Sequence, residues 1–148
     1  MIVIFDIDGT LANLDHRLHH WRETPKNWDA FKDGMKDDEL IIPVFEVYHA
    51  LRKDPTNKIV AVTGRGEDTR ETTETWLNNH HIFFDRIYMR TAHDRRQDTV
   101  IKAELLEKLV KEFGELPTMV FDDRPSVVRT WRKLGVFCFN VYQAEEEF

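Results

Sequence analysis

Two pairs of acidic residues in this sequence directly follow short apolar runs. Asp6 and Asp8 come after the run IVIF, and Asp122 and Asp123 come after TMVF. Carboxylates at the end of a buried strand are costly unless a cation or a reacting group lies among them. Oxygen ligands without cysteine or histidine favour Mg²⁺, and Mg²⁺ held by a few carboxylates typically contacts a phosphate. The pattern therefore predicts a Mg²⁺ site that handles a phosphate group.

The elements that must position these carboxylates alternate between strands and helices. Apolar runs predict strands at 2–5, 58–62, 86–89, 118–121 and 136–139. Apolar residues at helical spacing predict helices at 41–51, 67–78, 98–113 and 126–134, with two short amphipathic helices within 15–39. This alternation predicts an α/β fold with a doubly wound parallel sheet. Ligands bind at the carboxyl ends of such strands, where the aspartates can meet Thr63 and Lys102.

Composition sets the broad class. The chain has 148 residues, a net charge of −6 and a single cysteine, Cys138. The length suits one domain over residues 1–148, and the charge argues against wrapping a long nucleic acid. One cysteine allows no disulfide framework, and no apolar window or leader predicts a membrane segment or export. We therefore expect a cytoplasmic protein without a membrane partner, in the host cytoplasm if its source is viral.

Apolar side chains at helical spacing identify the expected core. For the helix at 98–113 the predicted stripe is Val100, Leu105, Leu106, Leu109 and Val110. Trp131 is expected to face inward from its own helix. Within 15–39, the aromatic residues Trp21, Trp28 and Phe31 are expected to pack as the core of a small insert. The histidines there, His16, His19 and His20, are expected to form a polar helix face rather than a metal cluster.

Four short motifs, in order, resemble those of the haloacid dehalogenase (HAD) superfamily of aspartate-nucleophile phosphatases. They are DIDGT, TGR, Lys102 and FDDR. More closely, TGR with ETTETWL, MRTAHDRRQDTVIK and DDRPSVVRTWRKLGV is similar to the phosphatase module of phage polynucleotide kinase–phosphatases, over nearly the whole chain. The resemblance implies a three-layer Rossmann-like sheet flanked by helices, with a small helical cap insert at about 12–40. There is no GxxxxGK[ST] loop, so we expect no kinase domain in this chain.

The resemblance also implies roles for individual residues. Asp6 would attack phosphorus and form an aspartyl-phosphate, while Asp8 would act as general acid and then base. Thr63 and Lys102 would hold the phosphoryl oxygens. Mg²⁺ would be held by Asp6, the backbone carbonyl of Asp8 and one aspartate of the DD pair. Asp123 is favoured as the direct ligand with Asp122 behind it, an order that the sequence leaves open.

Further residues are expected to contact substrate or to order the site. Arg65 and Arg124 would bind substrate phosphate or order Asp123. Arg96 lies in a locally basic run that suits a nucleic-acid end. The expected substrate-binding residues are Thr10, Gly64, Arg65, Arg96 and Arg124.

The motifs favour a Mg²⁺-dependent phosphomonoesterase that removes phosphate from the 3′ end of a polynucleotide. A 5′(3′)-deoxyribonucleotidase acting on free nucleotides is the alternative, because such enzymes share the DxDGT and DDR motifs. The substrate is thus a phosphorylated nucleic-acid end or a nucleotide. A phospho-accepting receiver domain is an alternative of another class, but receivers carry the acceptor aspartate in mid-chain, whereas Asp6 comes first here. The oligomeric state stays open.

Overall fold

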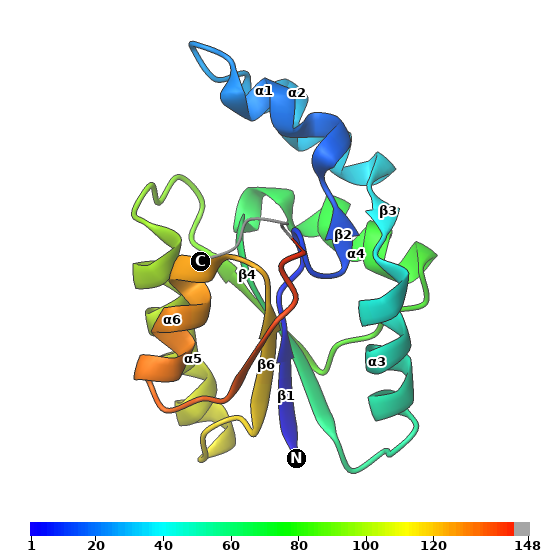
Figure 1. Cartoon of the computed structure of the whole chain (residues 1–148), viewed down its shortest axis with the longest axis vertical. Helices are drawn as coiled ribbons and strands as arrows, with labels where there is room; N and C mark the ends of the chain where they lie inside the picture. The colour runs from blue at the N-terminus through cyan, green and yellow to red at the C-terminus, as the bar shows by residue number, and fades with distance from the viewer. Residues whose placement is uncertain (144–148) are drawn as a thin grey trace.

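A five-stranded parallel sheet forms the centre of the computed structural model, which describes residues 1–143 (Figure 1). The strand order is β5-β4-β1-β6-β7. The bounds are β1 Ile2–Phe5, β4 Lys58–Gly66, β5 Arg86–Arg90, β6 Met119–Asp122 and β7 Cys138–Asn140. The predicted strands and the α/β class are confirmed. Within the described residues, no helix is both long and apolar enough to cross a membrane.

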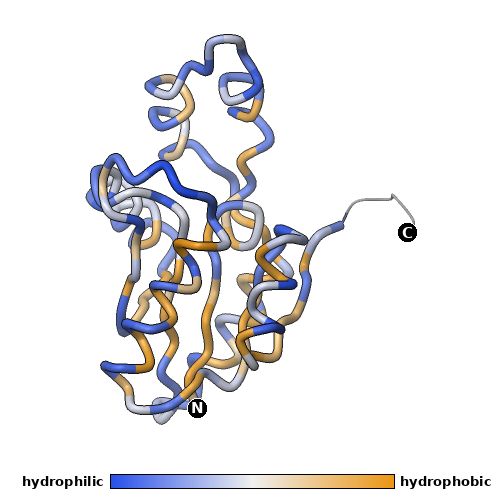
Figure 2. Tube along the Cα trace, turned by 90° about the vertical axis from the view of Figure 1, so that its left-hand side faces the viewer, coloured by the Kyte–Doolittle hydropathy of each residue, from blue (hydrophilic) through white to orange (hydrophobic). Residues whose placement is uncertain are grey.

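Four helices cover the two faces of the sheet and make it the middle of three layers. Their bounds are α3 Ile42–Arg52, α4 Arg70–Asn79, α5 Asp98–Phe113 and α6 Pro125–Lys133. α5 and α6 bury one apolar cluster against the sheet, and α3 and α4 bury a second cluster against the opposite face. Figure 2 shows the same division, with hydrophobic colour along the central strands and on the inner sides of the helices. The predicted three-layer arrangement is therefore confirmed.

β1 is the central strand and marks the point where the direction of winding reverses. It pairs in parallel with β4 on one side and with β6 on the other. The chain runs from β1 outward to β4 and β5 and then returns to β6, next to β1. In open α/β sheets, ligands bind at the carboxyl end of the strands at this reversal. The sequence places Asp6 directly there.

A small insert rises above the carboxyl end of the sheet (Figure 1). It is joined to the sheet by the antiparallel pair β2 (Ala12–Asn13) and β3 (Glu39–Leu40) and contains α1 (Leu18–Arg22) and α2 (Trp28–Asp33). The expectation that Trp28 packs inside it is wrong, since that residue is 49% exposed. Neither short helix contains a buried residue, because five or six residues present too little apolar surface to enclose a core.

The core facing α5 differs from the predicted stripe at one end. Leu105, Leu106 and Leu109 are buried, but Val100 is 42% exposed and Ile101 is buried in its place. Ile101, Leu105 and Leu109 are spaced four residues apart, so they follow one line along the helix and Val100 falls outside it. Trp131 is fully buried, as predicted.

This difference can be measured through stability. Leu109→Ala should lower the free energy of unfolding by about 2–5 kcal/mol, because it removes buried methyl groups and leaves a cavity. Val100→Ala, on the same helix, should change it by less than about 0.5 kcal/mol because Val100 is 42% exposed and lies outside the buried line of the helix. Denaturant unfolding followed by circular dichroism measures both. Equal losses in the two variants would contradict the observed packing of α5.

Candidate functional site

Three carboxylates meet at the carboxyl ends of β1 and β6. Phe5 and Phe121 are paired across the two strands, so the next residues, Asp6 and Asp122, are neighbours, with Asp123 following. The backbone N–H of Asp6 donates to the carbonyl of Phe121 at 3.0 Å, which extends the pairing beyond the strand. Each aspartate places one carboxylate oxygen within 4.8 Å of the others. The register of two parallel strands therefore assembles the cluster.

Lys102 is the positive charge at the centre of this cluster. Its buried Nζ lies 2.8 Å from Asp6 Oδ1 and 3.0 Å from Asp122 Oδ2. Burial acts to lower the pKa of Lys102, but Asp122 and Asp6 outweigh it and raise that pKa above its ordinary value. Burial, reinforced by Asp122, raises the pKa of Asp6 well above its usual range. Three carboxylates facing one lysine lack positive charge, and hard oxygen donors of this kind fit a divalent cation such as Mg²⁺.

The two aspartates of the DD pair differ in how their oxygens are used. Asp122 Oδ2 accepts hydrogen bonds from Lys102 and from Trp131 Nε1 at 3.1 Å, and its Oδ1 accepts from the backbone N–H groups of Asp123 and Arg124. Asp123 Oδ1 accepts from the Thr10 hydroxyl at 3.2 Å. Within residues 1–143, Asp123 Oδ2 accepts no hydrogen bond. Asp123 therefore keeps an oxygen available for a ligand, whereas the protein itself occupies both oxygens of Asp122.

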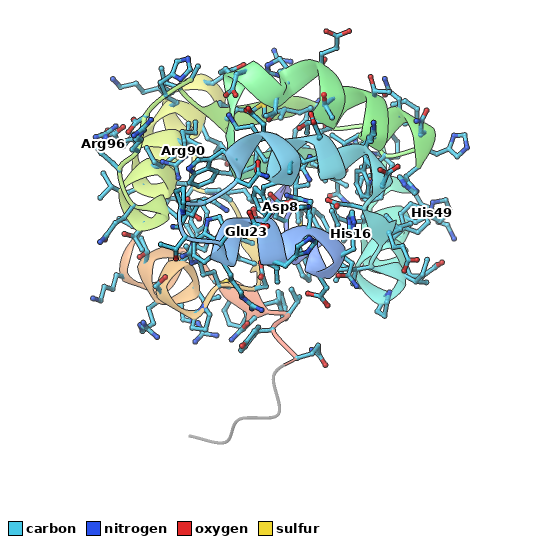
Figure 3. The ribbon with its side chains drawn as sticks, turned by 90° about the horizontal axis from the view of Figure 1, so that it is seen from above. Asp8, His16, Glu23, His49, Arg90 and Arg96 are labelled. Atoms are coloured by element: carbon cyan, nitrogen blue, oxygen red, sulfur yellow. The ribbon has the colours of Figure 1, made fainter. Side chains whose placement is uncertain are left out.

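Asp8 lies outside the carboxylate cluster and is held by two arginines. Arg17 Nη2 and Arg65 Nη2 each donate to Asp8 Oδ1 at 2.7 Å. Burial acts to raise the pKa of Asp8, but Arg65, and then Arg17, outweigh it, so its pKa lies below the ordinary value. Figure 3 shows Asp8 beneath the insert in the view from above. The aspartates at positions 6 and 8 thus have opposite electrostatic environments.

Asp38 joins the same two arginines from the far end of the insert. Arg17 Nε donates to Asp38 Oδ1 at 2.8 Å, and Arg65 Nη2 donates to Asp38 Oδ2 at 3.2 Å. The indole of Trp76 donates to the backbone carbonyl of Asp38 at 2.9 Å. All four side chains are buried. This network ties the insert to β4 and α4 while it orients Asp8.

Thr63 and Gly64 lie inside β4, which continues four residues past its predicted end. The Thr63 hydroxyl oxygen accepts from the backbone N–H of Arg65 at 3.1 Å, and its proton has no acceptor among residues 1–143. A Cβ at Gly64 would lie 2.6 Å from Asp98 Oδ1. Glycine at this position therefore allows Asp98 to approach the strand.

The remaining predicted binding residues have individual partners. The buried Arg65 is bound to Asp8 and not to Asp123. The exposed Arg124 donates to Asp98 Oδ2 at 2.9 Å. The Arg96 guanidinium binds Asp94 and Glu104, and Figure 3 places it, with Arg90, towards one side of the molecule. The structure thus gathers Asp6, Thr10, Lys102, Asp122 and Asp123 in one place and leaves Arg96 paired with surface carboxylates.

Sequence reasoning missed four residues that shape the site: Arg17, Asp38, Asp98 and Trp131 as a hydrogen-bond donor. Arg17 stands among histidines in HRLHHW, and Asp38 stands in the acidic run KDDE. Asp98 begins α5, where an acidic residue also suits the helix dipole. Trp131 was expected only as core. No local pattern distinguishes these side chains from ordinary surface or core residues.

Comparison with known proteins agrees with this geometry. The family model of the polynucleotide kinase PNKP phosphatase domain matches residues 1–146. A protein of Autographa californica nuclear polyhedrosis virus, provisionally named a bifunctional polynucleotide kinase/RNA ligase, is 28% identical over 152 residues, which cover 99% of this chain. The chain spans only 20% of the length of that viral relative.

Solved structures give the same result. A chain in the structure of the Pnkp1/Rnl/Hen1 RNA repair complex matches with a TM-score of 0.81 and 32% identity, covering 98% of this chain and 43% of that one. A haloacid dehalogenase-like hydrolase from Streptococcus pneumoniae matches with a TM-score of 0.69 and 15% identity, covering 94% of this chain and 83% of that one. At that identity the second match concerns the fold alone. The matches favour a phosphatase over a receiver domain.

The turn after β1 offers a direct test of the carboxylate cluster. A Cβ at Gly9, which has a φ of +80°, would lie 2.1 Å from Asp123 Oδ2. Gly9→Ala should therefore displace Asp123 and lower phosphatase turnover by about a hundredfold or more. Gly135→Ala is the matched control, because its φ is +85° but no atom lies within 4 Å of the added Cβ. It should cost about 1 kcal/mol of stability and keep turnover. Equal turnover in both variants would show that the approach to Asp123 is not required.

Proposed function

The chain belongs to the family of polynucleotide kinase PNKP phosphatase domains within the haloacid dehalogenase superfamily, and from this we propose a Mg²⁺-dependent phosphomonoesterase that removes 3′-phosphate from polynucleotide ends. One observation carries the chemistry. Asp6, Asp122 and Asp123 converge on the buried Lys102 at the carboxyl end of the central strand. A phosphoryl group needs a nucleophile and positive charge at one point, and this cluster can provide both.

Asp6 is the proposed nucleophile. One of its oxygens accepts from Lys102 at 2.8 Å, which fixes the carboxylate. Attack on phosphorus forms the Asp6–phosphate bond as the bond to the leaving alkoxide breaks. Water then cleaves the aspartyl-phosphate and returns free Asp6 and inorganic phosphate. The hydroxyl of Thr63 and the ammonium of Lys102 are the proposed donors to phosphoryl oxygens during both steps.

Asp8 is the proposed general acid and base. Its pKa lies below the ordinary value because Arg65 and Arg17 outweigh the effect of burial, so it is ionised in the free protein. A phosphate bound nearby adds negative charge and raises that pKa again, which favours uptake of a proton from solvent. Asp8 then protonates the leaving alkoxide and, once ionised, removes a proton from the attacking water. The two arginines keep its carboxylate in place for both transfers.

Mg²⁺ is the proposed metal. Asp6, Asp123 and the backbone carbonyl of Asp8 would hold it, with Asp122 behind them, because both Asp122 oxygens already accept hydrogen bonds from the protein. When bound, Mg²⁺ supplies positive charge that neutralises phosphoryl oxygens and the crowded carboxylates. The free oxygen of Asp123 supports its assignment as the direct ligand.

We propose that residues 12–40 act as a cap on a single phosphatase domain over residues 1–148. Arg17 enters the site from this segment and reaches Asp8, so the segment contributes directly to the acid–base group. The insert contains only two short α-helices, and we expect a cover of this size to admit a polymer end. Arg124, whose side chain is 56% exposed, and the segment around Arg96 are the proposed contacts for substrate phosphate and backbone.

The substrate assignment is supported by the relatives. The matching family and the viral relative carry polynucleotide kinase in their names, and the structural relative is part of an RNA repair complex. We therefore propose a phosphorylated nucleic-acid end as substrate and the cytoplasm, including that of a host cell, as the place of action. A 5′(3′)-deoxyribonucleotidase is the competing assignment.

The nucleophile has a direct test. Asp6→Asn should lower turnover by at least about 10⁴-fold, because an amide cannot form the aspartyl-phosphate. Asp54→Asn, in an exposed turn, is the control and should keep full turnover. Hydrolysis of an aryl phosphate in Mg²⁺ measures both, and circular dichroism verifies that each variant is folded. Near-normal turnover of Asp6→Asn would rule out this nucleophile.

A substrate panel separates the two assignments. In Mg²⁺, kcat/KM should be highest for an oligonucleotide with a 3′-phosphate, compared with 3′-mononucleotides, 5′-mononucleotides and an aryl phosphate. The reason is that only the oligonucleotide can also contact Arg124 and the segment around Arg96. A preference for 5′-mononucleotides would instead identify a nucleotidase. Arg124→Ala should reduce the advantage of the oligonucleotide over the aryl phosphate.

A further inference from the structure

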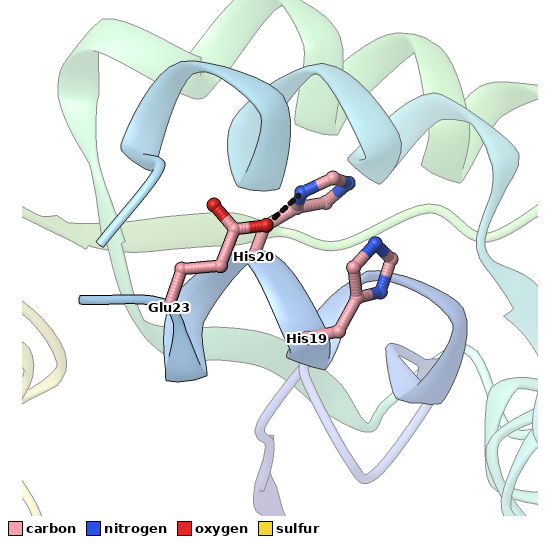
Figure 4. Close-up of side chains that lie close together, drawn as sticks. All are labelled: His19, His20 and Glu23. Carbon is pink, nitrogen blue, oxygen red and sulfur yellow. Dashed lines mark hydrogen bonds and ion pairs between the residues drawn. The ribbon is translucent and has the colours of Figure 1, made fainter. Parts of the chain in front are cut away.

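A second cluster of metal-ligating side chains lies in the insert, on α1 and at the residue that directly follows it. His19, His20 and Glu23 each place one ligand atom within 4.8 Å of the others. Figure 4 shows the three side chains close together, with the ring of His20 directed at the carboxylate of Glu23. These residues are separate from the aspartate cluster. None of them takes part in the proposed phosphatase chemistry.

The spacing of the ligand atoms suits one bound metal ion. His20 Nδ1 and Glu23 Oε1 form a long hydrogen bond of 3.3 Å. Two ligand atoms bound at about 2.0–2.1 Å to one tetrahedral metal ion lie about 3.3 Å apart. The rings of His19 and His20 are 3.8 Å apart between centroids, and the ring nitrogens of His19 form no hydrogen bond within residues 1–143. Small rotations of these half-exposed side chains would complete three bonds to one ion.

The helix that carries the cluster is short and buries no residue. α1 has five residues, no buried residue and no side-chain hydrogen bond at its N-terminus. Helices this short are unstable alone, and very small units commonly depend on a metal or a disulfide. The single cysteine of the chain, Cys138, lies in β7. A metal bound by residues 19, 20 and 23 would link one full turn of α1 and stabilise the insert.

We propose that His19, His20 and Glu23 form a binding site for a transition-metal ion of the Zn²⁺ class. Two imidazole nitrogens and one carboxylate oxygen are donors that Zn²⁺ prefers, whereas Mg²⁺ requires mainly oxygen. Three protein ligands leave a fourth position for water or for an oxygen of a bound molecule. The proposal is an alternative to the expectation of a polar helix face for His19 and His20. The site does not depend on the proposed phosphatase function.

The test uses Co²⁺ as a spectroscopic substitute for Zn²⁺, added to the full chain in excess Mg²⁺. Imidazole-bound four-coordinate Co²⁺ absorbs visible light much more strongly than Co²⁺ surrounded by oxygen, so the two clusters can be told apart. Wild type should show strong absorption that saturates at one Co²⁺ per chain and is removed by Zn²⁺. Asp123→Asn should leave this signal unchanged, since it alters only the aspartate cluster.

Variants of the three ligands then locate the site. His19→Ala, His20→Ala and Glu23→Gln should each weaken Co²⁺ and Zn²⁺ binding at least tenfold. His49→Ala, on α3 and distant from Glu23 in Figure 3, is the histidine control and should bind as wild type. Far-UV circular dichroism verifies folding, and Glu23→Gln keeps the shape of the side chain should an alanine variant unfold.

Hydrogen exchange gives an independent measurement. Zn²⁺ should slow amide exchange in residues 18–23 of wild type and leave it unchanged in Glu23→Gln. Absence of the strong Co²⁺ absorption in wild type would overturn the proposal. Wild-type affinity in the variants at positions 19 and 20 would overturn it as well.

Discussion

The excess of negative charge around Lys102 is the constraint on which the rest of the site depends. The buried ammonium of Lys102 is tolerated because two carboxylates, at 2.8 and 3.0 Å, pair with it. Those carboxylates in turn need its positive charge. The third carboxylate, Asp123, keeps one oxygen for which the described part of the chain provides no N–H or hydroxyl donor. The sheet register, the Trp131 indole and the Thr10 hydroxyl all hold these carboxylates in place. The fold thus maintains a local excess of negative charge at the carboxyl end of the sheet.

The two aspartates of DIDGT lie two residues apart but have opposite electrostatic environments. Burial and Asp122 raise the pKa of Asp6, whereas Arg65 and Arg17 hold the pKa of Asp8 below its ordinary value despite burial. Groups whose pKa values are moved in opposite directions are typical of acid–base sites. Here the separation depends on Arg65 of β4 and on the insert, which contains both Arg17 and Asp38. The insert therefore contributes to the electrostatic environment of Asp8.

Buried ion pairs attach the insert to the rest of the domain. Its helices α1 and α2 bury no residue, while Arg17 and Asp38, in the same insert, are buried. Ion pairs of this kind require complete hydrogen bonding, which Arg65 and Trp76 supply from the body of the domain. A metal on α1 would add a second polar link on the outer side. Both would compensate for an apolar core that the segment is too short to form.

The sequence by itself determined the five strands, the four covering helices, the aspartates at the strand ends, the threonine of β4 and the lysine of α5. The strands and helices follow from the periodicity of apolar residues, which is visible in short stretches of sequence. The meeting of the polar residues follows because parallel strands end at the same edge of the sheet. The tertiary structure alone decided that Arg65 binds Asp8, 57 residues away, and that Arg17 binds Asp38, 21 residues away. It also decided which aspartate of the DD pair keeps a free oxygen, and that Trp28 lies outside. Such outcomes depend on which side chains meet after packing, and long charged side chains can reach many partners. No spacing in the sequence encodes that choice.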